Sequence, residues 1–108
     1  MRPAPTKDPN VVVLAFHMKG CGACEEYLPR LRKIARTPRP ELGGLAYSDY
    51  IPIYEIDANQ REDLSNKYLI QYTPTTIILR RPTGMIRRDS ALTDAEIEHL
   101  LGVALRGS

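Results

Sequence analysis

The sequence predicts a single α/β domain in which helices cover both faces of a mixed sheet of about four strands. Two observations lead to this prediction. The expected elements follow the order strand, helix, strand, helix, strand, strand, helix, which is typical of a layered α/β architecture. The chain has 108 residues, of which 43% are hydrophobic, so it can bury one core and is too short for two domains.

The first strand is expected at residues 11–18, where the sequence VVVLAFHM is apolar and rich in β-branched side chains. A continuous run of this kind, ending close to a glycine, is typical of a central strand that is covered on both faces. Residues 1–10 contain three prolines and no apolar period. We therefore expect a flexible N-terminal arm at 1–10 and a folded domain at 11–108.

A helix is expected at residues 22–36, because apolar side chains recur there at helical spacing. These side chains belong to Cys24, Tyr27, Leu28, Leu31, Ile34 and Ala35. Glutamates near the start of this segment and basic residues near its end complement the helix dipole. Residues 37–50 contain prolines and a glycine pair, which favour a long and partly ordered connection.

The second half of the chain contains the remaining elements. A strand is expected at residues 51–56, followed by a short helix at 60–68 that Asn59 would cap. Residues 73–89 read as two strands around a turn at 82–84. In the final helix, Thr93 and Glu96 have the spacing of a capping box. A right-handed crossover through the first helix would make the first two strands parallel.

Cysteine count, charge and hydropathy exclude several classes of protein. Two cysteines cannot form the set of bridges found in small secreted scaffolds, and a net charge of +2 does not call for nucleic acid. The N-terminus has no apolar signal core, and the run at 11–16 is shorter than the ~18 residues of a spanning helix. We therefore expect a cytoplasmic protein, in which paired cysteines are catalytic or bind metal.

Both cysteines lie in the stretch KGCGAC, between the first strand and the first helix. Cys21 would sit at the helix N-terminus, where unpaired N–H groups and the helix dipole favour a thiolate. Lys19 would favour that thiolate further, and His17 is a second candidate for tuning it. Cys24 follows three residues later on the apolar face of the helix, so it would be the buried, resolving thiol.

Three interpretations of this cysteine pair can be compared. A structural zinc site needs about four ligands, and apart from carboxylates the chain adds only His17 and His99 to the two cysteines. A disulfide across three positions closes too small a loop to stabilise the fold much. We therefore favour a redox pair that needs neither metal nor cofactor, with a pair of structural free thiols as an alternative.

In this arrangement the sequence resembles the thioredoxin family, over roughly residues 11–105. The features that match are the apolar strand leading into CGAC, Pro29 five residues after Cys24, the segments YEIDAN and YTPTTIIL, and Gly84 in the hairpin. The family's full form has a strand and a helix before the strand that leads to the cysteines. The resemblance therefore implies a thioredoxin-like sandwich that is trimmed at the N-terminus.

The resemblance also implies an activity and a site. It implies a thiol–disulfide oxidoreductase with a redox-active Cys-Gly-Ala-Cys dithiol that acts in electron transport. The bond before Pro74 would be cis and would face the cysteines, and Gly22, Ala23 and Thr73 would join Pro74 in contacting substrate. Backbone beside Pro74 could pair with an extended substrate strand. The implied partners are protein disulfides and, as electron donor, a reductase or a low-molecular-weight thiol.

The sequence departs from the family pattern at several positions, two of which are Gly20 and Ala15. Gly20 stands where the family usually has tryptophan, and Ala15 stands where it has a buried acid. The proton acceptor for Cys24 is then left open between water, Glu55 and His17. Together with the long connection and an arginine-rich hairpin, these departures motivate an alternative function, a thioredoxin-fold binding or assembly module with weak or vestigial redox activity.

Overall fold

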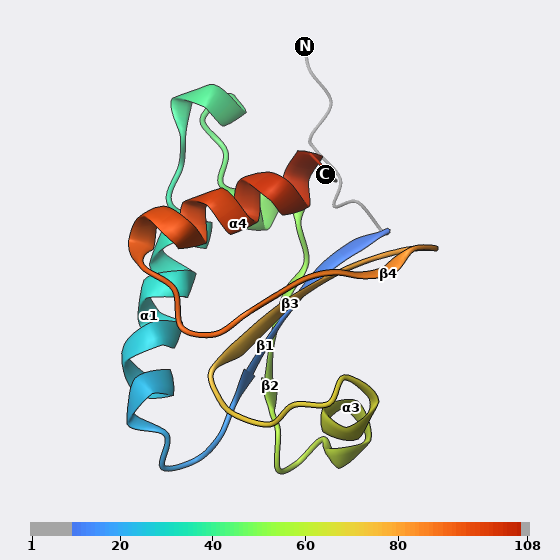
Figure 1. Ribbon diagram of the computed structural model, residues 1–108. Helices are drawn as coiled ribbons and strands as arrows, with labels where there is room; N and C mark the ends of the chain where they lie inside the picture. Colours follow the sequence, from blue (N-terminus) through green and yellow to red (C-terminus); the bar gives the residue numbers. More distant parts are fainter. Residues whose placement is uncertain (1–9, 107–108) are drawn as a thin grey trace.

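The computed structural model describes residues 10–106 (Figure 1). Its core is a four-stranded sheet with the strand order β2-β1-β3-β4. The strands are β1 (Val11–His17), β2 (Ile53–Asp57), β3 (Thr75–Arg80) and β4 (Gly84–Asp89). The predicted arm lies almost entirely outside the described residues, so the division of the chain near residue 10 stays a prediction. None of the helices within 10–106 is long and apolar enough to cross a membrane.

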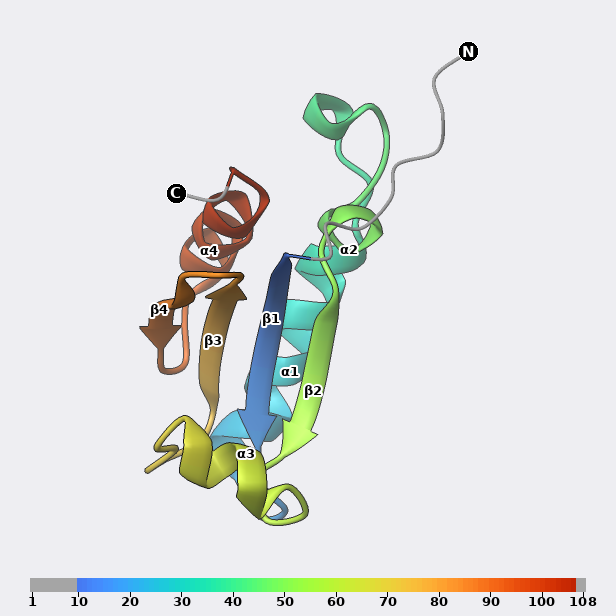
Figure 2. The same cartoon turned by 90° about the vertical axis from the view of Figure 1, so that its right-hand side faces the viewer.

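Helices cover the sheet on both faces, as predicted (Figures 1 and 2). The long helices α1 (Gly22–Arg36) and α4 (Asp94–Arg106) pack together on one face, and the short helix α3 (Glu62–Lys67) lies on the other. β1 pairs with β2 in parallel and with β3 in antiparallel orientation, and β3 pairs antiparallel with β4. The prediction of a mixed α/β sheet with two parallel strands is confirmed.

β1 has an apolar side chain at nearly every position because both of its faces are buried. Val11, Val13 and Ala15 belong to the core under α1 and α4, whereas Leu14 and Phe16 belong to the core under α3. Successive side chains of a strand point to opposite faces, so a strand between two helical layers loses the usual apolar and polar alternation. The placement of β1 at the centre of the sheet follows from this.

The connection at residues 37–50 contains more structure than its sequence predicts. It forms a 3-10 turn (Pro40–Leu42) and the four-residue helix α2 (Tyr47–Tyr50). The N–H of Arg39 donates to the carbonyl oxygen of Leu45 at 3.0 Å, and the carboxylate of Asp49 accepts from the N–H of Ala46 at 2.8 Å. The buried ring of Tyr47 fixes the segment on the core.

Two predicted boundaries are wrong. β2 begins at Ile53 rather than residue 51, because the N–H of Ile51 is used by the carbonyl oxygen of Tyr47 to end α2. Asn59 does not cap α3. Instead, the carboxylate of Asp57 accepts from the N–H of Asn59 at 2.8 Å and forms a turn, so that α3 begins only after its N-cap Arg61.

Side-chain contacts fix the start of α4. The predicted capping box is confirmed: the N–H of Glu96 donates to Thr93 Oγ1 at 3.3 Å, and the N–H of Thr93 donates to Glu96 Oε1 at 2.9 Å. Arg30 of α1 donates to the carbonyl oxygen of Leu92 and to the carboxylate of Asp94, both at 2.9 Å. These contacts hold the beginning of α4 against the helix that carries the cysteines.

Candidate redox site

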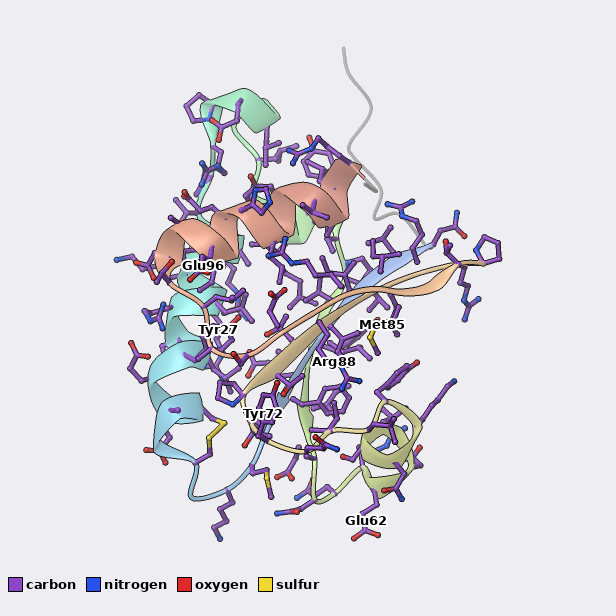
Figure 3. The ribbon with its side chains drawn as sticks, in the orientation of Figure 1. Tyr27, Glu62, Tyr72, Met85, Arg88 and Glu96 are labelled. Carbon is purple, nitrogen blue, oxygen red and sulfur yellow. A yellow bond between two sulfur atoms is a disulfide. The ribbon has the colours of Figure 1, made fainter. Side chains whose placement is uncertain are left out.

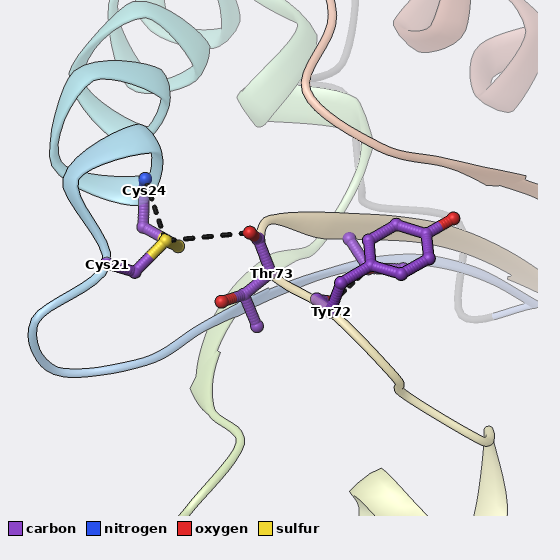
Figure 4. Close-up of a disulfide and its surroundings, with 5 residues drawn as sticks. Cys21, Cys24, Tyr72 and Thr73 are labelled. Carbon is purple, nitrogen blue, oxygen red and sulfur yellow. Dashed lines mark hydrogen bonds between the residues drawn. A yellow bond between two sulfur atoms is a disulfide. The ribbon is translucent and has the colours of Figure 1, made fainter.

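The two cysteines form a disulfide at the N-terminus of α1, with their Cα atoms 5.2 Å apart (Figure 4). Cys21 is the N-cap of the helix, as predicted, and its sulfur accepts a hydrogen bond from the N–H of Cys24 at 3.1 Å. The side chain of Cys24 is buried with 2% exposure, whereas Cys21 is half-buried. Cys21 is therefore the more exposed of the two cysteines.

The loop before β3 faces this disulfide (Figure 4). The peptide bond between Thr73 and Pro74 is cis, as the resemblance implies. Cys21 Sγ lies 3.6 Å from the carbonyl oxygen of Thr73. A disulfide sulfur carries no hydrogen, so this contact becomes a hydrogen bond only when Cys21 is a thiol. Thr75 Oγ1 donates to the carbonyl oxygen of Tyr72 at 2.6 Å and holds the turn.

The other predicted site residues lie on the first turn of α1 and at the end of β1 and the turn that follows it. Gly22 and Ala23 are exposed on the first turn of α1, beside Cys21. Lys19 is exposed in the turn after β1, and His17 is half-buried at the end of β1, opposite Asp57 of β2. Within residues 10–106, neither Lys19 nor His17 hydrogen bonds to a cysteine, and their tuning role stays a prediction.

A buried hydroxyl pair that sequence patterns do not predict lies between α1 and β3. Tyr27 and Thr76 are both fully buried, and Tyr27 Oη lies 3.0 Å from Thr76 Oγ1. Thr76 is directly opposite Ala15 in the sheet. Burial raises the pKa of Tyr27, so its phenol stays protonated and is not a proton acceptor for Cys24. The sequence feature that could have indicated this pair is a threonine inside an otherwise apolar strand.

Glu55 is held by an ion pair rather than left free near the cysteines. Arg32 Nε donates to Glu55 Oε2 at 2.6 Å, and this contact is the main reason that the pKa of Glu55 is lowered, with His17 a smaller contributor. A carboxylate with a lowered pKa is a weaker base. Of the acceptors left open for Cys24, Glu55 is thus disfavoured, and water and His17 remain.

The fold and this site together define a class. A central strand runs into a disulfide at a helix N-terminus, a cis-proline loop faces that disulfide, and the four-stranded mixed sheet carries helices on both faces. This is a thioredoxin-fold protein with a Cys-x-x-Cys pair. In the described part of the chain, no group of three or more His, Cys, Asp or Glu side chains is arranged to hold a metal ion.

The chain belongs to the thioredoxin family, because the family model Thioredoxin matches residues 5–102. It is 28% identical to Thioredoxin-1 of Drosophila melanogaster over 74 residues, which are 68% of this chain and 61% of that protein. It is 26% identical to Thioredoxin 2 of Plasmodium berghei over 88 residues, 82% of this chain and 50% of that protein. The chain therefore spans between half and two thirds of these two relatives.

A solved structure agrees with the family assignment at the level of the fold. The thioredoxin of Malassezia sympodialis superposes with a TM-score of 0.75 and 20% sequence identity, over 93% of this chain and 81% of that chain. At this identity the likeness concerns the fold alone.

Proposed function

We propose that this protein is a thiol–disulfide oxidoreductase that exchanges disulfides with protein substrates. The observation that carries the proposal is the pairing of a half-buried Cys21 at a helix N-cap with a buried Cys24 and the facing carbonyl of Thr73. The helix N-terminus stabilises a thiolate on Cys21 through the N–H of Cys24 and the helix dipole. Membership of the thioredoxin family supports the same activity.

The exchange proceeds in two displacement steps. The Cys21 thiolate attacks one sulfur of the substrate disulfide, a mixed disulfide forms, and the other substrate sulfur leaves as a thiolate that takes up a proton. Cys24 then loses its proton and attacks the Cys21 sulfur. The bond between Cys21 and the substrate breaks as the Cys21–Cys24 disulfide forms, and the second substrate thiolate leaves. Two electrons have then passed to the substrate.

The substrate would be positioned by the residues around Cys21. Gly22 and Ala23 leave its approach open because neither has a bulky side chain, and the backbone of Thr73 and Pro74 would pair with an extended substrate segment. Lys19 and His17 would tune the thiolate. A reductase or a low-molecular-weight thiol would return the disulfide to the dithiol, and the cytoplasm is the compartment in which such donors keep thiols reduced.

Reduction of insulin disulfides with dithiothreitol as electron donor tests this proposal. We expect wild-type protein to accelerate the reaction and Cys21→Ser to give only the rate of dithiothreitol alone. Cys24→Ser is the matched control, because it loses the same disulfide but keeps the attacking thiol, and it should accumulate a mixed disulfide with insulin. Equal rates for Cys21→Ser and wild type would show that the proposal is wrong.

One observation favours the alternative of a binding or assembly module with weak redox activity. Ala15 is buried with 1% exposure at the position of the family's acid, and the neighbouring buried pair Tyr27 and Thr76 supplies only hydroxyl groups. Alkylation of Cys21 as a function of pH separates the two functions. A clearly lowered thiol pKa supports the oxidoreductase, whereas a pKa close to the ~8.5 of free cysteine supports the module.

A further inference from the structure

The α3 face of the sheet is covered at only one end. α3 lies over the end at which β1 finishes, and no described helix covers the opposite end of this face (Figure 2). A groove of about 590 Å³ lies there. Residues from all four strands line it, and Lys67 and Tyr68 at the end of α3 form one wall. Its size is that of a site for a ligand or a few side chains.

The floor of this groove is apolar. Val12, Leu79 and Met85 are neighbours on three adjacent strands, because Val12 is opposite Leu79 and Leu79 is opposite Met85. Tyr54 of β2 completes the floor, and it is 57% exposed, while Met85 is 40% exposed. Large apolar side chains that gather on one open surface typically mark an interaction site.

The rim of the groove is positively charged. Lys67 and Arg81 are both exposed and both line it, and no aspartate or glutamate is among its described lining residues. Lys67 Nζ lies 5.5 Å from the centre of the Tyr68 ring, so the ammonium group of Lys67 lies next to an aromatic side chain. The groove therefore complements a partner that combines negative charge with bulky apolar groups.

We propose that this groove binds an acidic peptide segment with bulky apolar side chains, supplied by a partner protein. The apolar side chains would cover Tyr54, Leu79 and Met85, and the carboxylates would pair with Lys67 and Arg81. A second copy of this chain is a poorer occupant. In a two-fold dimer the same surface meets itself, which would bring both pairs of cations together.

This surface is separate from the redox site. The groove lies where β1 begins, whereas Cys21 follows the end of β1, and the seven residues of this strand span about 20 Å. Changes in the groove should therefore leave disulfide exchange intact. The proposal does not depend on the activity of the cysteines, and either can fail without the other.

Fluorescence polarisation with a labelled peptide of alternating Glu, Phe and Leu residues tests the proposal. The double variant Lys67→Glu with Arg81→Glu should weaken binding by about tenfold or more. Its control is Lys33→Glu with Arg106→Glu, which changes the net charge equally at sites away from the groove and should stay close to wild type. Met85→Ser should also weaken binding, because it removes part of the apolar floor. The far-UV circular dichroism spectrum and the urea unfolding midpoint should stay close to wild type in all three variants, which verifies that they fold whether or not the cysteines are active.

Several results would overturn the proposal. Binding that does not saturate, or a peptide with Lys in place of Glu that binds equally well, would show that the groove does not select acidic segments. Equal loss of binding in the two double variants would mean that only net charge matters. A dimer in sedimentation that disappears in Met85→Ser would assign the surface to self-association instead.

Discussion

Tyr27 shows how a single buried contact joins two parts of the redox site. Its ring lies on the core face of α1, three residues after Cys24, and its hydroxyl pairs with Thr76, two residues after Pro74 (Figure 3). The guanidinium of Arg30 lies 5.6 Å from the centre of the same ring. The helix that carries the cysteines and the strand that follows the proline loop are thus held together by a specific polar contact.

The substitution Tyr27→Phe should lower the free energy of unfolding by about 1–2 kcal/mol, because it leaves the buried hydroxyl of Thr76 without its partner. Urea denaturation measures this change. Tyr50→Phe is the control, since its hydroxyl donates to the carbonyl oxygen of Leu42 at a partly exposed site, and it should cost less. If both variants lost the same free energy of unfolding, burial of the Tyr27 hydroxyl would not be the cause of the destabilisation.

The Glu55–Arg32 ion pair should make stability depend on acid pH. The pKa of Glu55 is lower in the folded protein than in the unfolded chain, mainly through Arg32, so the folded state binds this proton less readily. Its contribution is complete above the unfolded pKa of ~4.3 and is lost as pH falls through the folded pKa. Because the carboxylate is partly exposed, the contribution should be below about 1 kcal/mol.

Urea denaturation of Glu55→Gln at several pH values measures this contribution. The variant should be less stable than wild type at pH 7, and the difference should shrink as the pH falls below the unfolded pKa of ~4.3 and vanish once it is below the folded pKa. A difference for Glu55→Gln that is constant with pH would show that the ion pair is not its cause.

At the scale of elements, helix ends and turns decide where each segment starts. The capping box of α4 satisfies two backbone N–H groups reciprocally, those of Thr93 and Glu96. Thr93→Ala should therefore lower the free energy of unfolding by about 1 kcal/mol. Thr83→Ala, at an exposed position in the hairpin, should have little effect. Equal losses in thermal or urea unfolding would contradict this role of the cap.

Signals that are local in sequence allowed correct prediction of several elements. The apolar run of β1, the helical spacing from Cys24 to Ala35 and the capping box at Thr93 each act within a few residues, and all three predictions agree with the structure. The position of Cys21 at a helix N-terminus could be predicted because the sequence places it between the apolar run of β1 and the helical spacing of α1. The architecture could therefore be predicted from the order of elements.

Features that depend on contacts distant in sequence could not be predicted. α2 has only four residues, too few to show a period, and it is fixed by packing of Tyr47 on the core. The contact of Tyr27 with Thr76 spans 49 positions, and the ion pair of Arg32 with Glu55 spans 23. The groove on the α3 face arises from side chains of four strands, which come together only in the sheet.

At the scale of the whole molecule, the two cores are unequal. The core between the sheet and the helices α1 and α4 contains most of the fully buried large side chains, whereas the core under α3 is smaller and includes partly buried residues such as Leu64 and Tyr68. Global stability should therefore depend mainly on the first core. The layer around α3 should open more readily by local unfolding.

Two leucine substitutions test this distribution of stability. Leu101→Ala, at a fully buried position of α4, should lower the free energy of unfolding by about 2–5 kcal/mol. Leu64→Ala, at a half-buried position of α3, should cost about 1 kcal/mol and mainly speed hydrogen exchange of the amides in α3. Similar decreases in the free energy of unfolding for both variants would contradict the prediction that the two cores contribute unequally to stability.

The outer strands β2 and β4 have a neighbouring strand on only one side within the described chain, and this has a consequence for aggregation. An open strand edge is a template on which a second molecule can extend the sheet. Pro52 and the ionised Glu55 interrupt such pairing at β2, while Arg87, Asp89 and a β-bulge do so at β4. The charges on β2 and β4 therefore protect the protein from aggregation by pairing of edge strands at high concentration.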